Sequence, residues 1–132
     1  MKVNIIFPMA GESSRFNYIF KPFIQISDQK FIELAFKYFY KYEDYLNKIY
    51  FVVTEEQNKT NQVNEKLNEI FTSYSIDFEI IVLEKKTKSQ YETVRKGILK
   101  CNITGPTIIC DCDHSIDVSP LFDYLLEKNN FD

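Results

Sequence analysis

Two short segments of the chain carry residue types that could bind a phosphorylated ligand. The first runs from Pro8 to Arg15 as Pro-Met-Ala-Gly-Glu-Ser-Ser-Arg, and Lys21 follows shortly after it. Small residues let backbone N–H groups approach phosphate oxygens closely, and Arg15 and Lys21 would add two positive charges. When a triphosphate is attacked at its α-phosphorus, charge builds up on its oxygens, so these two cations would stabilise the transition state more than the ground state.

This loop differs from two better-known phosphate loops. It lacks the Gly-Lys-Ser/Thr ending of a Walker loop and the three glycines of the dinucleotide fingerprint. An ordinary surface loop is the alternative interpretation. The residues that would contact a nucleotide are the small and polar ones between the first strand and Arg15, with the Glu12 side chain turned to solvent. They are Ala10, Gly11, Glu12, Ser13 and Ser14.

The second segment is a pair of aspartates, Asp111 and Asp113, which directly follows an apolar run. Two carboxylates separated by one residue repel each other unless a cation offsets their charge. Mg²⁺ takes one or two carboxylates together with phosphate oxygens and keeps several waters, which suits this pair. Asp111 and Asp113 are therefore candidate metal ligands, and an acidic solvated turn is the alternative. His114 is the only histidine of the chain and is interpreted as a polar surface group.

The elements that must position these segments are predicted from hydrophobic periodicity. Short apolar runs rich in β-branched residues predict buried parallel strands at residues 3–7, 49–53, 78–83 and 107–110. Helical periods lie between them, and each has one apolar face that is predicted to point inward. These faces are formed by Ile32, Ala35, Phe36 and Phe39, by Val63, Leu67, Ile70, Phe71 and Tyr74, and by Tyr91, Val94 and Ile98. A fourth helix is predicted near Ser119, which can cap it, with Pro120 at its first position.

The alternation of strands and helices predicts an α/β fold. Right-handed crossovers make it an open parallel Rossmann-like sheet of order 3-2-1-4 with helices on both faces, in three α/β/α layers. Ligands of such sheets bind beyond the carboxyl ends of the strands, where the strand order reverses. The loops after the first and fourth strands, which hold both candidate segments, are therefore predicted to meet.

Length and charge restrict the partners. With 132 residues and 45% hydrophobic content, the chain can bury one core, so a single domain spanning residues 1–132 is expected. The net charge of -3 gives no positive field that would hold a nucleic-acid backbone. The cysteines are odd in number, and no segment resembles a signal peptide or a membrane span, which predicts a reduced cytoplasmic setting without a membrane partner.

A larger pattern resembles a known family. The run Phe-Pro-Met-Ala-Gly-Glu-Ser-Ser-Arg-Phe at residues 7–16, then Lys-Pro-Phe-Ile at 21–24 and Phe-Ile-Glu at 31–33, resembles the signature of the sugar-phosphate nucleotidyltransferase superfamily. That signature has a small-residue loop ending in Arg, a Lys-Pro, and an apolar residue with Ile-Glu opening a helix. Two features depart from it, because Ser13 replaces a usual glycine and the interval from Arg15 to Lys21 is slightly short.

The resemblance implies roles for both segments. The loop would wrap a triphosphate, Arg15 and Lys21 would contact its phosphates during catalysis, and Asp111 or Asp113 would bind the catalytic Mg²⁺. Asp111 is favoured because it lies nearer the strand end. The resemblance also implies that Gln90, with Ser89 beside it, contacts the nucleobase, since a glutamine amide offers both a donor and an acceptor to a base edge.

Ser89 has a structural interpretation as well, because with Glu92 it forms a capping box at the start of the third helix. Gln90 is compatible with pyrimidines, so CTP or UTP is preferred to ATP or GTP as the nucleoside triphosphate. The predicted function is Mg²⁺-dependent transfer of a nucleoside monophosphate to a phosphorylated small-molecule acceptor, such as a sugar 1-phosphate, with release of pyrophosphate. Biosynthesis of a surface polysaccharide such as a capsule is the expected setting.

Three alternatives compete with this prediction. One is a nucleotide-binding module without turnover, since the family's catalytic domain normally continues beyond the length of this chain. In that case the exposed edge of the fourth strand is expected to favour a homodimer. The others are a glycosyltransferase of related fold, which also uses an aspartate pair, and an aspartate-dependent phosphatase. Arg15 and Lys21 argue against both, because they address a triphosphate.

Overall fold

The computed structural model describes residues 2–11 and 19–128. Its elements follow one another along the chain as strands, helices and short 3₁₀ helices (η). In order they are β1 (Val3–Pro8), η2 (Lys21–Phe23), β2 (Gln25–Ile26), β3 (Gln29–Lys30), α1 (Phe31–Phe36), η3 (Tyr40–Tyr45), β4 (Leu46–Thr54), α2 (Glu55–Asn61), α3 (Val63–Phe71), β5 (Phe78–Leu83), α4 (Gln90–Cys101), β6 (Thr107–Ile109) and α5 (Ser119–Glu127).

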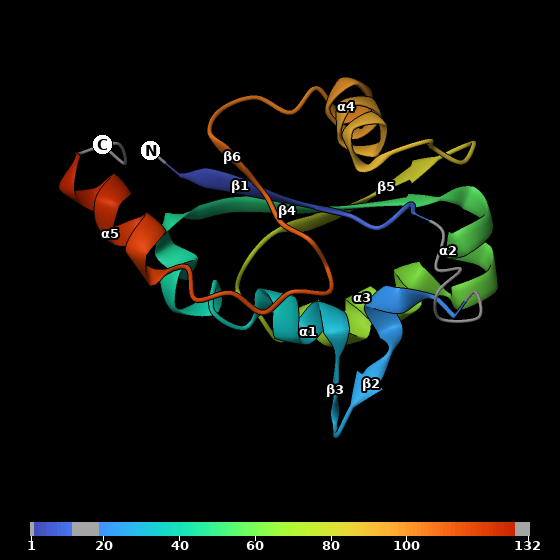
Figure 1. Cartoon of the computed structure of the whole chain (residues 1–132), viewed down its shortest axis with the longest axis horizontal. Coiled ribbons are helices and arrows are strands. Elements are labelled where there is room, and N and C mark those ends of the chain that lie inside the picture. Colours follow the sequence, from blue (N-terminus) through green and yellow to red (C-terminus); the bar gives the residue numbers. More distant parts are fainter. Residues whose placement is uncertain (1, 12–18, 129–132) are drawn as a thin grey trace.

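A parallel four-stranded sheet forms the centre of the fold. Its order is β5-β4-β1-β6, and every neighbouring pair is parallel. When the strands of this sheet alone are counted, this is the predicted order 3-2-1-4. What differs from the prediction is a separate two-stranded antiparallel hairpin, β2-β3, which projects from the body below α1 (Figure 1).

Helices cover both faces of the sheet, as predicted. Side chains alternate along a strand, so Ile5 and Phe7 of β1 belong to the core on one face and Ile6 belongs to the core on the other. The first core is covered by α1, α3 and α5, and the second by α4. Figure 1 shows α4 on one side of the sheet and α1 with α3 on the other, which gives the three α/β/α layers.

The larger core is built from aromatic rings. Phe36, Phe39 and Phe71 of the helical layer are buried against Phe7 and Phe51 of the sheet. The rings of Phe7 and Phe51 are stacked with centroids 5.6 Å apart, and Phe36 meets Phe71 edge to face at 5.3 Å. Because such rings interlock in preferred geometries, they fix the distance between the helices and the sheet.

Among the described residues, no helix combines the length and the apolar character that crossing a membrane requires.

On the opposite face, α4 approaches β4 closely at Gly97. A Cβ atom placed on Gly97 would lie 3.0 Å from Cγ2 of Val52 and 3.6 Å from Cδ1 of Ile81. A leucine at this position favours the helix by about 0.8 kcal/mol but overpacks the contact, which costs about 1–3 kcal/mol. We therefore expect Gly97→Leu to lower the free energy of unfolding, by up to about 2 kcal/mol, in urea titrations.

The matched control is Arg95→Leu, which introduces the same side chain on the exposed face of α4. A surface substitution of this kind changes the free energy of unfolding by no more than about 0.5 kcal/mol. Equal stability of Gly97→Leu and Arg95→Leu would mean that α4 does not rest on β4 through Gly97.

Candidate active site

A cavity of about 200 Å³ lies where β1 and β6 end, between the two loops that the sequence singled out. The backbone N–H of Met9 donates to the carbonyl of Val52 at 2.8 Å, and that of Cys110 donates to the carbonyl of Ile6 at 3.0 Å. These bonds extend the ladder beyond both strands and hold the loops side by side. The cavity is lined by Pro8, Met9, Gly11, Lys21, Pro22, Gln90, Thr93, Asp111, Cys112 and Asp113.

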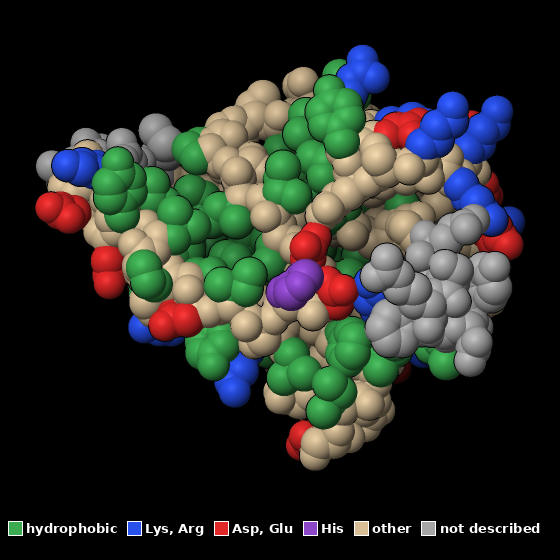
Figure 2. All heavy atoms as spheres, viewed as in Figure 1, with side chains coloured by type: hydrophobic (Ala, Val, Ile, Leu, Met, Phe, Trp, Pro, Cys, Tyr) green, Lys and Arg blue, Asp and Glu red, His purple; other side chains and the backbone are tan. Residues whose placement is uncertain are grey.

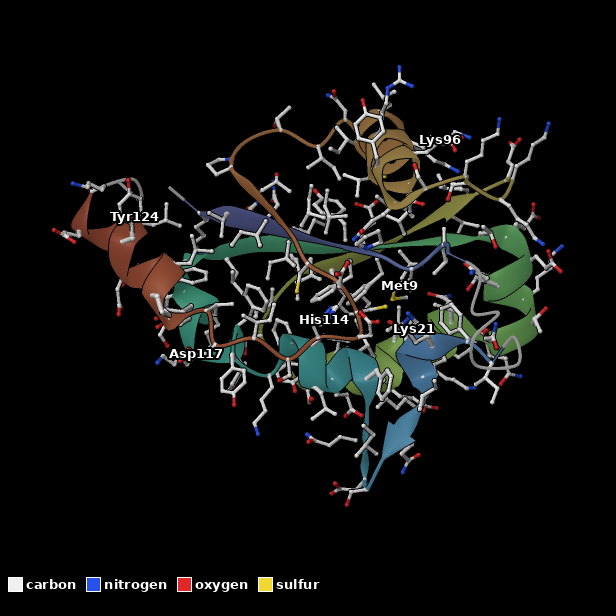
Figure 3. The ribbon with its side chains drawn as sticks, viewed as in Figure 1. Met9, Lys21, Lys96, His114, Asp117 and Tyr124 are labelled. Carbon is white, nitrogen blue, oxygen red and sulfur yellow. The ribbon has the colours of Figure 1, made fainter. Side chains whose placement is uncertain are left out.

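The structure brings five of the predicted site residues together around this cavity: Gly11, Lys21, Gln90, Asp111 and Asp113. Figure 3 shows Lys21 and His114 in the same region of the molecule. Two further predicted residues, Ala10 and Ser89, lie near the cavity but do not line it.

Ala10 is buried, and the Ser89 hydroxyl accepts a hydrogen bond from the N–H of Glu92 at 3.1 Å. Ser89 is thus the N-cap of α4, as predicted, but the predicted capping box is only half formed, because the Glu92 carboxylate accepts from the N–H of Lys88 instead of that of Ser89. The predicted contacts of Glu12, Ser13, Ser14 and Arg15 lie outside the described residues and stay predictions.

Side-chain contacts link the two aspartates to residues from other elements. Nζ of Lys21 donates to Oδ2 of Asp113 at 3.0 Å, and Nε2 of Gln90 donates to Oδ1 of Asp111. Nδ1 of His114 lies 3.2 Å from Oδ2 of Asp111 and 3.1 Å from Oδ1 of Asp113. In Figure 2 the histidine is exposed at the surface beside acidic side chains. Three segments of the chain therefore converge on one acidic pair.

The electrostatics of the pair keep Asp113 ionised. Partial burial acts to raise the pKa of Asp113, but the hydrogen bond and charge of Lys21, helped by His114, outweigh it and the pKa is lowered. Burial raises the pKa of the Cys110 thiol to about 11 and that of the Cys112 thiol to about 12, and the carboxylates add to both shifts. The thiols are therefore protonated at neutral pH and do not compete for a cation.

The donor set fits a divalent cation. Asp111, Asp113 and His114 each present one ligand atom, and these atoms lie within 4.8 Å of one another. Carboxylate oxygens and imidazole nitrogens are common ligands of divalent ions in proteins. Asp111 and Asp113 are therefore the described residues that would hold the cation that the resemblance implies.

Known structures share this arrangement of elements. A scan with protein-family models gives no match, and a search of curated proteins gives no significant relative. Among solved structures, a nucleoside-diphosphate-sugar pyrophosphorylase from Vibrio cholerae RC9 is 25% identical with a TM-score of 0.65, over 83% of this chain and 47% of its own. A 4-diphosphocytidyl-2C-methyl-D-erythritol synthase is 18% identical with a TM-score of 0.64, over 99% of this chain and 55% of its own.

This chain has the sugar-phosphate nucleotidyltransferase fold. The family resemblance found in the sequence is thereby confirmed at the level of the fold. The chain spans about half the length of the two solved structures that it matches. Within the nucleotidyltransferase fold, the cavity lies at the carboxyl ends of β1 and β6, where the strand order reverses and where ligands of open α/β sheets bind.

Two residues at this end of the nucleotidyltransferase fold were missed from the sequence. Thr93 lines the cavity with 1% of its surface exposed, and its hydroxyl lies 2.5 Å from that of Thr87 and 3.1 Å from the carbonyl of Ser89. A polar residue three positions after Gln90, on the inward face of a predicted helix, was the available signal. His114 is exposed, as its interpretation as a surface group predicted, but the contact of its ring with both aspartates was missed.

The ion pair of Lys21 and Asp113 makes stability depend on pH. The pKa of Asp113 is lower in the folded protein than in the unfolded chain. The ion pair therefore stabilises the fold fully at pH values above the pKa of Asp113 in the unfolded chain. This stabilisation is lost as the pH falls through the pKa of Asp113 in the folded protein. We expect Lys21→Met to lower the free energy of unfolding at pH 7 by no more than about 1 kcal/mol. The difference from the wild type should shrink below about pH 4.

Urea titrations from pH 7 to pH 3 in metal-free buffer measure this difference. Lys37→Met, which removes an exposed lysine distant in sequence from the pair, controls for the loss of one positive charge. A difference between Lys21→Met and the wild type that stays constant down to pH 3 would show that Asp113 does not mediate it.

Proposed function

We propose that this chain binds a nucleoside triphosphate with a divalent cation, as the nucleotide-binding part of a nucleotidyltransferase. The reaction transfers a nucleoside monophosphate to a phosphorylated small-molecule acceptor and releases pyrophosphate. One observation carries the proposal: Lys21 from the loop after β1, and Asp111 and Asp113 from the loop after β6, line one cavity at the reversal point of the sheet. A cation and a carboxylate pair at this place suit a triphosphate and its metal ion.

The residues around the cavity are proposed to have separate roles in the reaction. A phosphate oxygen of the acceptor attacks the α-phosphorus, a new P–O bond forms, and the bond to the β-phosphate breaks so that pyrophosphate leaves. Lys21 stabilises the negative charge that builds up on the triphosphate oxygens, since its ammonium group already lies at the edge of the cavity. Asp111 and Asp113 would hold the cation, which would supply further positive charge to the phosphates. Arg15 is the second cation proposed for this role.

Recognition of the base is proposed for the start of α4. The amide of Gln90 lines the cavity and Ser89 lies next to it, so both can face a base that enters between α4 and the loop after β1. Gly11 is proposed to offer backbone contacts, together with Ala10, Glu12, Ser13 and Ser14. We further propose CTP or UTP as the triphosphate, because Gln90 suits a pyrimidine edge and one structural neighbour is named a diphosphocytidyl compound synthase.

The acceptor and the cellular setting are part of the same proposal. The name of the other neighbour contains a nucleoside-diphosphate sugar, which supports a sugar 1-phosphate as acceptor. Surface-polysaccharide synthesis in the cytoplasm is the setting that we propose. Mg²⁺ is proposed as the cation of the reaction.

A homodimer is supported by Ile109, Leu121 and Tyr124, which are exposed on β6 and α5. Hydrophobic side chains gather on this face (Figure 2).

Isothermal titration calorimetry with each of the four nucleoside triphosphates and Mg²⁺ tests the proposal. The expected result is Mg²⁺-dependent binding of CTP or UTP, unchanged in the control Asp123→Asn on the exposed side of α5. Tighter binding of a ready-made nucleotide sugar than of any triphosphate would support the glycosyltransferase alternative instead. Binding without pyrophosphate release, in the presence of sugar 1-phosphates, would identify a nucleotide-binding module without turnover.

A further inference from the structure

Three potential ligand atoms converge at the tip of the loop after β6. They are Oδ2 of Asp111, Oδ1 of Asp113 and Nδ1 of His114, and the imidazole nitrogen lies 3.2 Å and 3.1 Å from the two oxygens. Two of these atoms are hard oxygen donors and the third is a nitrogen. The set therefore differs from the all-oxygen surroundings that Mg²⁺ usually takes.

Donors from two other elements orient the carboxylates. Gln90, at the start of α4, donates to Oδ1 of Asp111, and Lys21, at the start of η2, donates to Oδ2 of Asp113. Each carboxylate thus has one oxygen held from outside the loop and turns its other oxygen towards His114. Outside partners of this kind fix the orientation of metal ligands, and their loss typically weakens metal binding about 10–100-fold. The convergence of the three atoms is therefore held by contacts that come from separate parts of the chain.

We infer that Asp111, Asp113 and His114 form a three-ligand cation site whose imidazole nitrogen makes it prefer first-row transition ions, such as Mn²⁺, to Mg²⁺. The inference rests on the proposed function, because it concerns the cation of that same site. Mg²⁺ releases its waters reluctantly and favours oxygen ligands, whereas affinity for nitrogen donors rises along the first-row transition series from Mn²⁺ onwards. Removing the nitrogen should therefore affect Mn²⁺ much more than Mg²⁺.

The test is the affinity of the whole chain for Mn²⁺ and for Mg²⁺, in the wild type and in His114→Gln. Electron paramagnetic resonance measures the concentration of free Mn²⁺ and so gives the affinity for Mn²⁺ directly. Competition between Mg²⁺ and bound Mn²⁺ gives the affinity for Mg²⁺. His114→Gln is expected to weaken Mn²⁺ binding about tenfold and Mg²⁺ binding less than about twofold, so that the ratio of the two affinities falls. Because the His114 side chain is 58% exposed, the substitution should leave the fold intact, which circular dichroism checks.

Asp123→Asn, which removes a carboxylate from the exposed side of α5, is the matched control and should leave both affinities unchanged. An unchanged Mn²⁺ to Mg²⁺ ratio in His114→Gln overturns the inference, because the imidazole would then only pair with the carboxylates. A wild type that binds neither ion overturns it as well.

Calorimetry with each of the four nucleoside triphosphates and Mg²⁺ on the same samples separates this inference from the proposed function. CTP binding together with an unchanged metal ratio means that the inference fails and the proposed function stands. A metal ratio that falls, in a chain that binds no nucleoside triphosphate, means that the cation site stands and the proposed function fails.

Discussion

Asp111→Asn is expected to lower the Mg²⁺-dependent affinity of the chain for its nucleoside triphosphate about 100-fold. Loss of an outside partner of a metal ligand alone costs about 10–100-fold, and this substitution removes the charge of a ligand itself. A 100-fold loss corresponds to about 2.7 kcal/mol of binding free energy. Calorimetric titration of CTP, with and without Mg²⁺, measures it.

Asparagine is the informative replacement at this position because it separates charge from shape. Its side-chain carbonyl can still accept the hydrogen bond that Gln90 donates to Oδ1 of Asp111, so the start of α4 keeps its contact. What disappears is the negative charge on the atom that faces His114. The substitution therefore tests cation binding with little disturbance of the surrounding structure.

Asp113→Asn provides the comparison. The ion pair with Lys21 offsets part of the negative charge of Asp113, so loss of that charge weakens the attraction for a cation less. We therefore expect the larger loss of Mg²⁺-dependent binding for Asp111→Asn. A larger loss for Asp113→Asn would transfer the main ligand role to Asp113. Equal affinities of Asp111→Asn and the wild type would contradict the proposed metal site.

The sheet could be predicted from the sequence because its central strands, β1 and β4, are buried on both faces. In β1, Ile5, Ile6 and Phe7 have no exposed surface, so selection for apolar side chains acts at every position and leaves a continuous run. The right-handed crossover rule then restricts the strand order. The meeting of the two functional loops followed from that order without any knowledge of the side-chain contacts.

The helices were harder to predict because their signals depend on what they pack against. Tyr91 was predicted to face inward but is 76% exposed, since α4 contacts the sheet through Val94 and Gly97 and is the only helix on its face within residues 2–11 and 19–128. Helix α2 was missed because none of its residues is buried, so it has no apolar period. It is separated from α3 by Gln62 in the left-handed conformation, with a φ of 51°.

Helix and loop ends also depend on local contacts that periodicity does not contain. Ser119 was predicted to cap α5, but it is the first helical residue, and its N–H donates to Oδ1 of Asp117 at 2.9 Å. His114 is exposed, as interpreted, but its contact with Asp111 was not predicted for the same reason, because the turn after β6 brings the ring back to that carboxylate. A lone histidine in a sequence gives no sign of such a turn.

Phe122→Ala is expected to lower the free energy of unfolding by about 3–5 kcal/mol, the usual cost of removing a buried phenylalanine ring. Phe122 has no exposed surface and is the only buried residue of α5. Its ring stacks on Tyr42 with centroids 4.3 Å apart and meets Phe39 edge to face at 6.4 Å. The ring is therefore the main attachment of α5 to the core, and its loss leaves a cavity next to η3.

Urea titration measures the effect, and Phe122→Leu is the control because it keeps most of the apolar volume. Volume-conserving changes in a core usually cost less than about 1.5 kcal/mol, so Phe122→Leu should lie well above Phe122→Ala in stability. Similar losses for both variants would indicate that the stacked geometry with Tyr42, more than the filled volume, attaches α5.

The same variant also tells which contacts hold the cation site. The loop with Asp111 and Asp113 joins β6 to α5, so a loosened α5 could let the carboxylates move. However, the carboxylates are held from the other side by Gln90 and Lys21, which belong to α4 and η2. We therefore expect the Mn²⁺ affinity of Phe122→Ala to stay within about threefold of the wild type, at temperatures where the variant is folded. Removal of the outside partners of metal ligands costs much more, roughly 10–100-fold. A loss on that larger scale would mean that the packing of α5 sets the geometry of the two aspartates.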